Sequence, residues 1–197
     1  MLNSIMKISW RNNLLILWYK FFRSKTNAKN LVRIGKEGKG ISNILFLLPA
    51  EKKFAQIASH FIKSEFKDNV SNVKYLVHED GIQFYSDKIK SNTMTYADDD
   101  FNYIGVLKNF ELINEIKMSK FEAIVDLNQS EEQTISFVSL ELDIPIKIGY
   151  KSVFSDQIYT IIIKPSSTGF LEKNYEIIEK ILDFIVVLSP INKGPSK

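Results

Sequence analysis

The sequence alternates short apolar runs with amphipathic segments, and this order constrains the fold more than any other feature. "NILFLLP" (43–49) is a continuous apolar run that ends at a proline, as expected for a strand buried on both faces. "FEAIVDL" (121–127) is a second run of this kind. Behind the first run, apolar residues recur at the spacing of a helix that buries one face, namely Phe54, Ile57, Ala58, Phe61 and Ile62.

The rest of the chain continues the alternation. Further strands are predicted at 73–77, 93–96, 146–150 and 157–165. Helices are predicted at 106–117, with Val106, Phe110 and Ile113 turned inward, around Ile135, Val138 and Leu142, and from Leu171 to Ile185. Strands that alternate with helices imply βαβ units, a mostly parallel sheet and helices on both of its faces. The predicted fold is therefore a single three-layer, Rossmann-like α/β domain.

Composition divides the chain into three regions. Residues 1–40 are expected to form a basic, aromatic N-terminal helix followed by a linker, because "RIGKEGKGIS" (33–42) is rich in glycine and lysine. Residues 41–188 would form the Rossmann-like domain, and residues 189–197 a polar tail. The chain has no cysteine, which excludes disulfides, thiolate nucleophiles and cysteine-ligated metals.

The charge is unevenly distributed. Residues 1–40 hold nine Lys or Arg against the single Glu37, and since the whole chain carries +3, the remainder carries −5. A basic arm on a mildly acidic body points to an anionic partner for the arm, either phospholipid or nucleic acid. The alternative is a solvated leader without a partner.

The N-terminal region combines these cations with aromatic rings of the kind favoured at a membrane interface. The candidate membrane-surface residues are Trp10, Trp18, Tyr19, Lys20, Phe21, Phe22 and Arg23. The stretch "LLILWYKFF" (14–22) is too short to cross a bilayer, and no signal-peptide cleavage site follows it. We therefore expect a cytoplasmic protein, peripheral at the inner membrane face through residues 1–40. The competing expectation is that this helix packs on its own domain or on a protein partner.

Ligands of parallel α/β sheets bind beyond the carboxyl ends of the strands. Three predicted loops lie at that edge, and their ligand-binding candidates are Lys52, Lys53, Asp98, Asp100, Asp126 and Asn128. The lysines follow a turn without the glycines that bring backbone amides to a phosphate, so a dinucleotide site is not expected. Each acidic candidate has a structural alternative, because Asp and Asn also cap helices and turns.

No catalytic or metal motif accompanies these candidates. His60 and His78 are the only histidines, and their spacing matches no metal site. The sequence contains neither a G-x-S-x-G nucleophile turn nor a Walker A loop. We predict no catalytic residue, no metal and no cofactor.

The element order, with "FEAIVDLNQSEEQTISFVSLELDIPIKIGYKS" (121–152), resembles the N-terminal, acceptor-side half of the ADP-heptose:lipopolysaccharide heptosyltransferase-like glycosyltransferases, which are of GT-B type. Their Ile-Asp-Leu and Arg-Ile-Gly strand ends correspond here to Val125-Asp126-Leu127 and Lys147-Ile148-Gly149. Residues 44–63 resemble the first strand and helix of that family. "DFNYIG" (100–105) is also similar to a small group of bacterial proteins of unknown function.

The departures from the transferase pattern bear on catalysis. The family carries Gly-Asp in its first turn, the Asp being its candidate base, and the aligned positions here are Lys53 and Phe54. A phenyl ring cannot accept a proton, whereas a general base typically contributes ~10²–10⁴ in rate. The family also holds its nucleotide-sugar on a second Rossmann domain, for which we expect no room in a chain ending at Lys197.

These observations favour a non-catalytic binding or scaffold protein linked to envelope glycan metabolism, with a sugar or lipid-linked acceptor as ligand. The alternative is a glycosyltransferase subunit that is active only with a separate donor-binding chain, and in that case Asp126 and the loop at 98–100 would serve the acceptor. A third hypothesis, RNA binding by the basic leader, is the least favoured.

Overall fold

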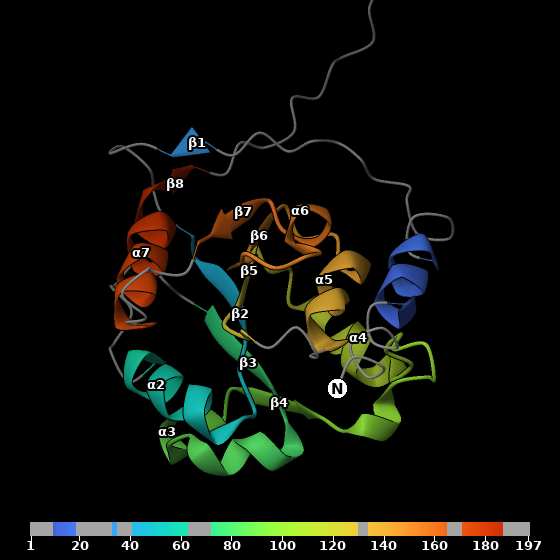
Figure 1. Ribbon diagram of the computed structural model, residues 1–197. Helices are drawn as coiled ribbons and strands as arrows, with labels where there is room; N and C mark the ends of the chain where they lie inside the picture. The colour runs from blue at the N-terminus through green and yellow to red at the C-terminus, as the bar shows by residue number, and fades with distance from the viewer. Residues whose placement is uncertain are drawn as a thin grey trace, which may run out of the picture.

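The computed structural model describes residues 10–18, 33–34, 41–62, 72–129, 134–164 and 171–186. Its centre is a six-stranded sheet in the order β4-β3-β2-β5-β6-β7, in which every neighbouring pair is parallel (Figure 1). The strands are β2 (Asn43–Leu47), β3 (Asn72–His78), β4 (Thr93–Tyr96), β5 (Ala123–Asp126), β6 (Ile146–Tyr150) and β7 (Ile161–Ile163). The predicted Rossmann-like α/β architecture is confirmed.

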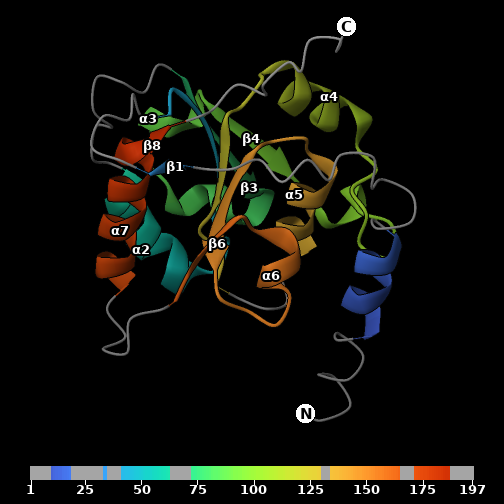
Figure 2. The same ribbon diagram turned by 90° about the horizontal axis from the view of Figure 1, so that it is seen from above.

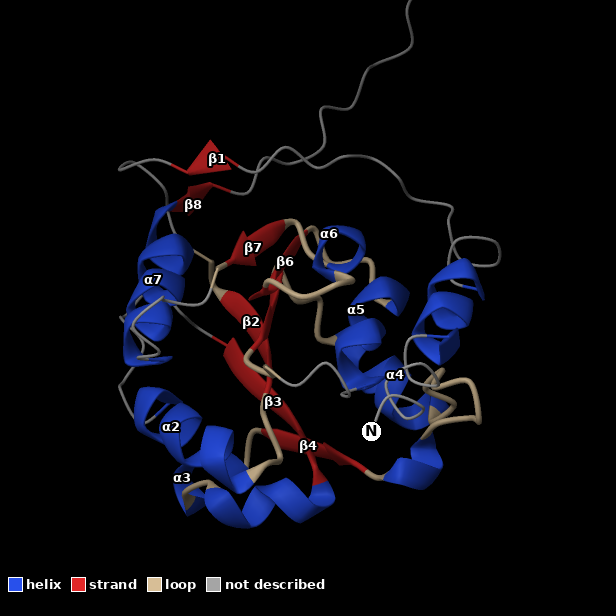
Figure 3. Ribbon diagram, in the orientation of Figure 1, coloured by secondary structure: helices blue, strands red, loops and turns tan. Residues whose placement is uncertain are grey.

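Helices cover both faces of the sheet, as Figure 3 shows. The α-helices of the domain are α2 (Lys52–Ile62), α3 (Asp87–Lys90), α4 (Phe110–Met118), α5 (Val138–Glu141), α6 (Ser155–Ile158) and α7 (Leu171–Phe184). Short 3-10 helices are η1 (Glu79–Phe84), η2 (Asp98–Asp100) and η3 (Thr134–Phe137). Residues 10–18 form a further helix at the N-terminal end, drawn in blue in Figure 1.

Two hydrophobic clusters fill the spaces between the layers. One joins the sheet to α2, α3 and α7, and at its centre the Phe46 ring meets Phe61 edge-on at 6.3 Å and stacks on Tyr75 at 5.9 Å. Tyr175 of α7 stacks on Phe61 at 4.7 Å, which ties α7 to α2. The other cluster joins the opposite face to α4, η3 and α5. β2 and β5 supply side chains to both clusters, which is why their sequences are apolar without alternation.

The strand order reverses between β2 and β5. The chain runs outward from β2 through β3 to β4, then returns to place β5 on the other side of β2 and continues to β6 and β7. Leu47 of β2 lies opposite Asp126 of β5 in the parallel register. The turns after these two strands therefore flank the switch point, where ligands of open α/β sheets bind.

Three local predictions are wrong. Part of the predicted linker is β1 (Arg33–Ile34), which pairs antiparallel with β8 (Ile185–Val186). The strand predicted over 157–165 is only β7, because α6 occupies its beginning and places Ile158 in a third hydrophobic cluster. Phe110, predicted to face inward, is 73% exposed, since α4 begins at this residue after the Asn109 cap.

The helix at 10–18 packs on the domain. Leu15 and Ile16 are buried against Phe137 and Ile158, with Trp18 at the margin of the same cluster. Figure 2 shows this helix on the side of the sheet that carries α5 and α6, far from α7. Of the two expectations for this segment, packing on its own domain is therefore found, whereas contact with a membrane stays a prediction.

Candidate functional site

Asp126, at the carboxyl end of β5, is a buried carboxylate with only 1% of its surface exposed. Its Oδ1 accepts hydrogen bonds from the backbone N–H of Asn128 at 2.9 Å and from Asn128 Nδ2 at 2.8 Å. Its Oδ2 accepts from the Tyr159 hydroxyl at 2.6 Å. Ser136 adds a further hydrogen bond to the carboxylate. Donors from the turn after β5, from η3 and from the segment after α6 thus converge on one carboxylate.

Burial and hydrogen bonding act in opposite directions on this carboxyl group. Burial raises the pKa of Asp126, and the hydrogen bonds from Ser136, Tyr159 and Asn128 oppose that increase. Burial, together with the neighbouring Asp126 carboxylate, raises the pKa of the Tyr159 hydroxyl well above its ordinary value. Tyr159 therefore keeps its proton at any ordinary pH and can only donate it as a hydrogen bond.

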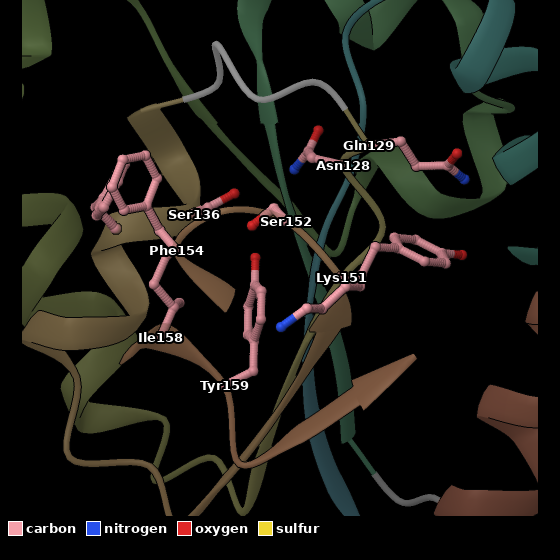
Figure 4. A pocket seen from close by; sticks show the side chains of 10 residues that line it. Asn128, Gln129, Ser136, Lys151, Ser152, Phe154, Ile158 and Tyr159 are labelled. Atoms are coloured by element: carbon pink, nitrogen blue, oxygen red, sulfur yellow. The ribbon is translucent and has the colours of Figure 1, made fainter. Parts of the chain in front are cut away.

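A pocket of about 90 Å³ opens beside this network. Figure 4 shows Tyr159 with its hydroxyl pointing toward the side on which Asn128, Ser136 and Ser152 lie. The lining residues are Asn128, Gln129, Ser136, Phe137, Tyr150, Lys151, Ser152, Phe154, Ile158 and Tyr159. They come from the ends of β5 and β6 and from η3 and α6, so the pocket lies at the edge of the sheet that parallel α/β folds use for ligands.

The pocket presents neutral hydrogen-bonding groups. Asn128 is 5% exposed, and its Oδ1 has no hydrogen-bond partner among the described residues, because the amide nitrogen is the end held by Asp126. Lys151, the one cation among the described lining residues, forms an ion pair with Asp156 at 2.8 Å. None of the ten described lining residues is an Asp, Glu or His. The ten described lining residues can accept and donate hydrogen bonds, but none of them carries a group suited to remove a proton from a ligand at neutral pH.

Gly149 permits the Tyr159 ring to lie against β6. A Cβ built on Gly149 would come within 2.3 Å of the Tyr159 Cζ atom, far inside contact distance. The glycine at the end of the "IKIG" strand is therefore required by a close approach of an aromatic ring. This requirement connects the motif in the sequence to the hydrogen bond between Tyr159 and Asp126.

The turn after β2 differs from the pocket after β5, because Tyr85 and Gly81 pack directly against it. The Pro49 carbonyl accepts a hydrogen bond from the buried Tyr85 hydroxyl at 2.7 Å. Gly81 lies so near that an added Cβ would be 2.7 Å from the Ala50 Cα. The candidates Lys52 and Lys53 follow this turn and are exposed on the first turn of α2. They do not line the pocket, and Lys53 Nζ lies 5.5 Å from the centroid of the Phe54 ring.

The acidic candidates after β4 also stay apart from Asp126. Asp100 caps η2, since its Oδ2 accepts from the Ala97 N–H and its Oδ1 from Asn109 Nδ2, both at 2.9 Å. Asp98 is fully exposed, and its Oδ1 lies 3.6 Å from His78 Nε2. His78 Nδ1 accepts from the Asp80 N–H at 3.2 Å, so the neutral ring carries its proton on Nε2, facing Asp98. The part of the chain that the structure describes contains no group of three His, Asp or Glu residues able to hold a metal ion.

Of the six predicted ligand-binding residues, the structure therefore brings together only Asp126 and Asn128. It adds Ser136, Ser152 and Tyr159, which the sequence did not single out. Tyr159 lies in a segment that was predicted to be a strand, so its role was not expected. The only sequence feature that indicates a ring packed on β6 is Gly149, ten residues earlier. Serines carry no comparable signal.

The membrane-surface candidates are only partly described. Trp10 is 66% exposed, whereas Trp18 is half-buried in the cluster under the N-terminal helix. Tyr19, Lys20, Phe21, Phe22 and Arg23 lie outside the described residues. Within the described ranges, no helix is long and apolar enough to span a bilayer.

Comparison with known proteins gives no relative: no protein-family model, no curated protein and no solved structure matches this chain. The class defined by the fold is therefore that of parallel, Rossmann-like α/β domains. The likeness to heptosyltransferase-like glycosyltransferases stays a prediction from the sequence.

Proposed function

We propose that this chain is a non-catalytic binding protein whose ligand is a glycan, held through a neutral sugar at the pocket between the ends of β5 and β6. The observation that carries the proposal is the arrangement around Asp126. Both of its carboxylate oxygens already accept hydrogen bonds from Asn128 and Tyr159, so it orders the pocket instead of taking a proton from a ligand.

The pocket's chemistry favours hydroxyl groups over phosphates. Asn128 offers a buried acceptor, and Ser136, Ser152 and Tyr159 offer hydroxyls. Lys151 is already paired with Asp156, so the described part of the lining has neither the free cations nor the glycine-rich amides that bind phosphate. A volume of about 90 Å³ holds a few hydroxyl-bearing atoms, so the rest of the sugar would extend outward.

A role in glycan metabolism rests on the likeness to the acceptor-side half of heptosyltransferase-like enzymes. Val125-Asp126-Leu127, on which that likeness partly depends, is the segment that carries the network. The family's Gly-Asp pair is replaced by Lys53 and Phe54, which lie in the first turn of α2 and do not line the pocket. Binding of a sugar or a lipid-linked sugar, without transfer, is consistent with both features.

The test is a titration of the ¹⁵N-labelled chain with N-acetylglucosamine, mannose and methyl glucoside, followed by backbone amide shifts. We expect saturable shifts confined to the turn after β5 and to residues 150–159, weakened by about tenfold or more in Asn128→Ala because the buried acceptor is lost. The control is Asn114→Ala, at an exposed position on α4, which should bind as the parent does. Absence of shifts with every sugar, or release of nucleotide from UDP-N-acetylglucosamine by the isolated chain, would contradict the proposal.

A further inference from the structure

The outer side of the N-terminal helix is apolar, although the helix already buries its inner side on the domain. Over residues 10–18, the exposed positions are Trp10, Asn13, Leu14 and Leu17, so three of the four are apolar. Trp10, Leu14 and Leu17 are 66%, 38% and 49% exposed. Helices on globular domains normally turn polar residues outward. A tryptophan and two leucines on one exposed stripe mark an interaction surface.

The turn to which this helix is fixed carries a further exposed aromatic side chain. Arg11 Nε donates to the Ile104 carbonyl at 3.1 Å, which fixes the helix to the turn at 102–106. Asn102 Oδ1 accepts from three successive backbone N–H groups of that turn, each at 3.0 Å. Tyr103, between these anchors, is 90% exposed. We define Trp10, Leu14, Leu17 and Tyr103 as the docking face.

The positive charge of the N-terminal region favours an anionic partner for the docking face. The chain has no Asp or Glu before Glu37, while Lys7 precedes residues 10–18 in the sequence and Lys20 and Arg23 follow them. Cations on both sides of an apolar stripe complement an anionic bilayer, where rings and leucines enter the interface and cations meet the headgroups. A second copy of the chain would bring two arms of net +8 together, which opposes dimerisation. RNA binding depends on stacking of bases on several aromatic rings, and the described outward positions of this helix offer only one, the Trp10 indole.

We propose that the docking face binds the surface of an anionic phospholipid membrane, with the helix at 10–18 lying in the interface plane while its inner side stays packed on the domain. The helix acts as a fixed ridge of the folded protein and not as a separate tether, because Leu15 and Ile16 hold it in place. Its described length of nine residues spans about 13 Å, which fits a helix lying in the interface plane.

The experiment is flotation of the full chain with vesicles of mixed phosphatidylcholine and phosphatidylglycerol, compared with vesicles of phosphatidylcholine alone. We expect flotation with the anionic vesicles, and a decrease of about tenfold or more with neutral vesicles or at high salt. The triple variant Trp10→Ser/Leu14→Ser/Leu17→Ser should lose flotation by about tenfold or more. A matched variant, Met118→Ser/Ile177→Ser, removes exposed apolar side chains from α4 and α7 and should float as the parent does.

Fluorescence provides a readout at the docking face itself. Trp10 and Trp18 are the only tryptophans, so Trp18→Phe leaves Trp10 as the single reporter. Its emission should shift to shorter wavelength on anionic vesicles and be quenched by brominated lipid. Circular dichroism checks that each variant is folded. Failure of the parent to float, equal flotation of the triple variant, or self-association or RNA binding in place of flotation would overturn the proposal.

Discussion

The turns after β2 and β5 are neighbours at the switch point of the sheet, yet the charged side chains are exposed after β2 and buried after β5. After β2, the Tyr85 hydroxyl satisfies the Pro49 carbonyl, and the charged side chains Lys52 and Lys53 extend into solvent. After β5, the charge itself is buried at Asp126 and three elements supply its donors. The exposed lysines constrain nothing around them, whereas a buried carboxylate must be satisfied and therefore fixes the side chains that line the pocket.

The largest expected effect is at Asp126. Asp126→Ala leaves the Asn128 amide groups and the Tyr159 hydroxyl without their buried acceptor, and each unsatisfied donor costs about 1–3 kcal/mol. We expect the free energy of unfolding to fall by about 3 kcal/mol or more. The comparison variant Lys53→Ala, at the exposed turn, should change it by less than about 0.5 kcal/mol. Urea denaturation measures both, and similar values for the two variants would remove the contrast between the turns.

Two glycines test the turns separately. Gly149→Ala forces the Tyr159 ring away from β6, and Gly81→Ala forces η1 away from Ala50. Each should destabilise the protein by about 1–3 kcal/mol, as overpacking does. Only Gly149→Ala should alter amide shifts around the pocket, and its cost should shrink in a Tyr159→Ala background. A pocket unaffected by Gly149→Ala would show that this glycine does not set the position of the Tyr159 ring. An equal effect of Gly81→Ala on the pocket would show that the two turns are not independent.

The hydroxyl groups of Tyr159 and Tyr85 offer a finer comparison. Tyr159 donates to a carboxylate at 2.6 Å, whereas Tyr85 donates to a neutral carbonyl at 2.7 Å. Hydrogen bonds to charged groups contribute about 1.5–3 kcal/mol and neutral ones about 0.5–1.5 kcal/mol. Tyr159→Phe should therefore cost more than Tyr85→Phe in thermal and urea unfolding. The reverse order would indicate that the carboxyl group of Asp126 is not charged in the folded protein.

The smallest expected effect is a dependence on pH. Because burial raises the pKa of Asp126, the folded protein holds this proton up to a higher pH than the unfolded chain does. The stability from this group is fully present below its unfolded pKa, about 3.9, and is lost as pH rises through the folded value. The stability difference between the parent and Asp126→Asn should therefore shift against the parent from pH 4 to pH 8. A shift in the parent's favour over that range would contradict the direction of the pKa change.

The sequence predicted the sheet and most of its helices because burial on both faces leaves a continuous apolar run that can be read directly. "NILFLLP" and "FEAIVDL" became β2 and β5, and the stripe behind β2 became α2. The segment 157–165 was predicted less well. Its apolar residues serve two different surfaces, since Ile158 packs under the N-terminal helix and Ile163 joins the sheet cluster.

The candidate site was only half predictable. Asp126 and Asn128 follow a buried strand, which is a pattern visible in the sequence. Tyr159 approaches Asp126 from 33 residues away, through a turn whose geometry depends on Gly149 and on a helix of four residues. Asp98 and Asp100 look like a cluster in the sequence, but one is solvated beside His78 and the other caps η2. Adjacency in sequence did not produce a shared site, whereas convergence in the fold did.

The hydroxyl proton of Tyr159 tests most directly whether Asp126 organises the pocket. A hydroxyl held at 2.6 Å to a buried carboxylate should give a downfield proton resonance that exchanges slowly with water. That resonance should be absent in Tyr159→Phe and in Asp126→Ala, and no such resonance should arise from Tyr103, which is 90% exposed. If the Tyr159 hydroxyl proton exchanges as fast as that of Tyr103, the carboxylate does not hold the ring and the pocket is not preorganised.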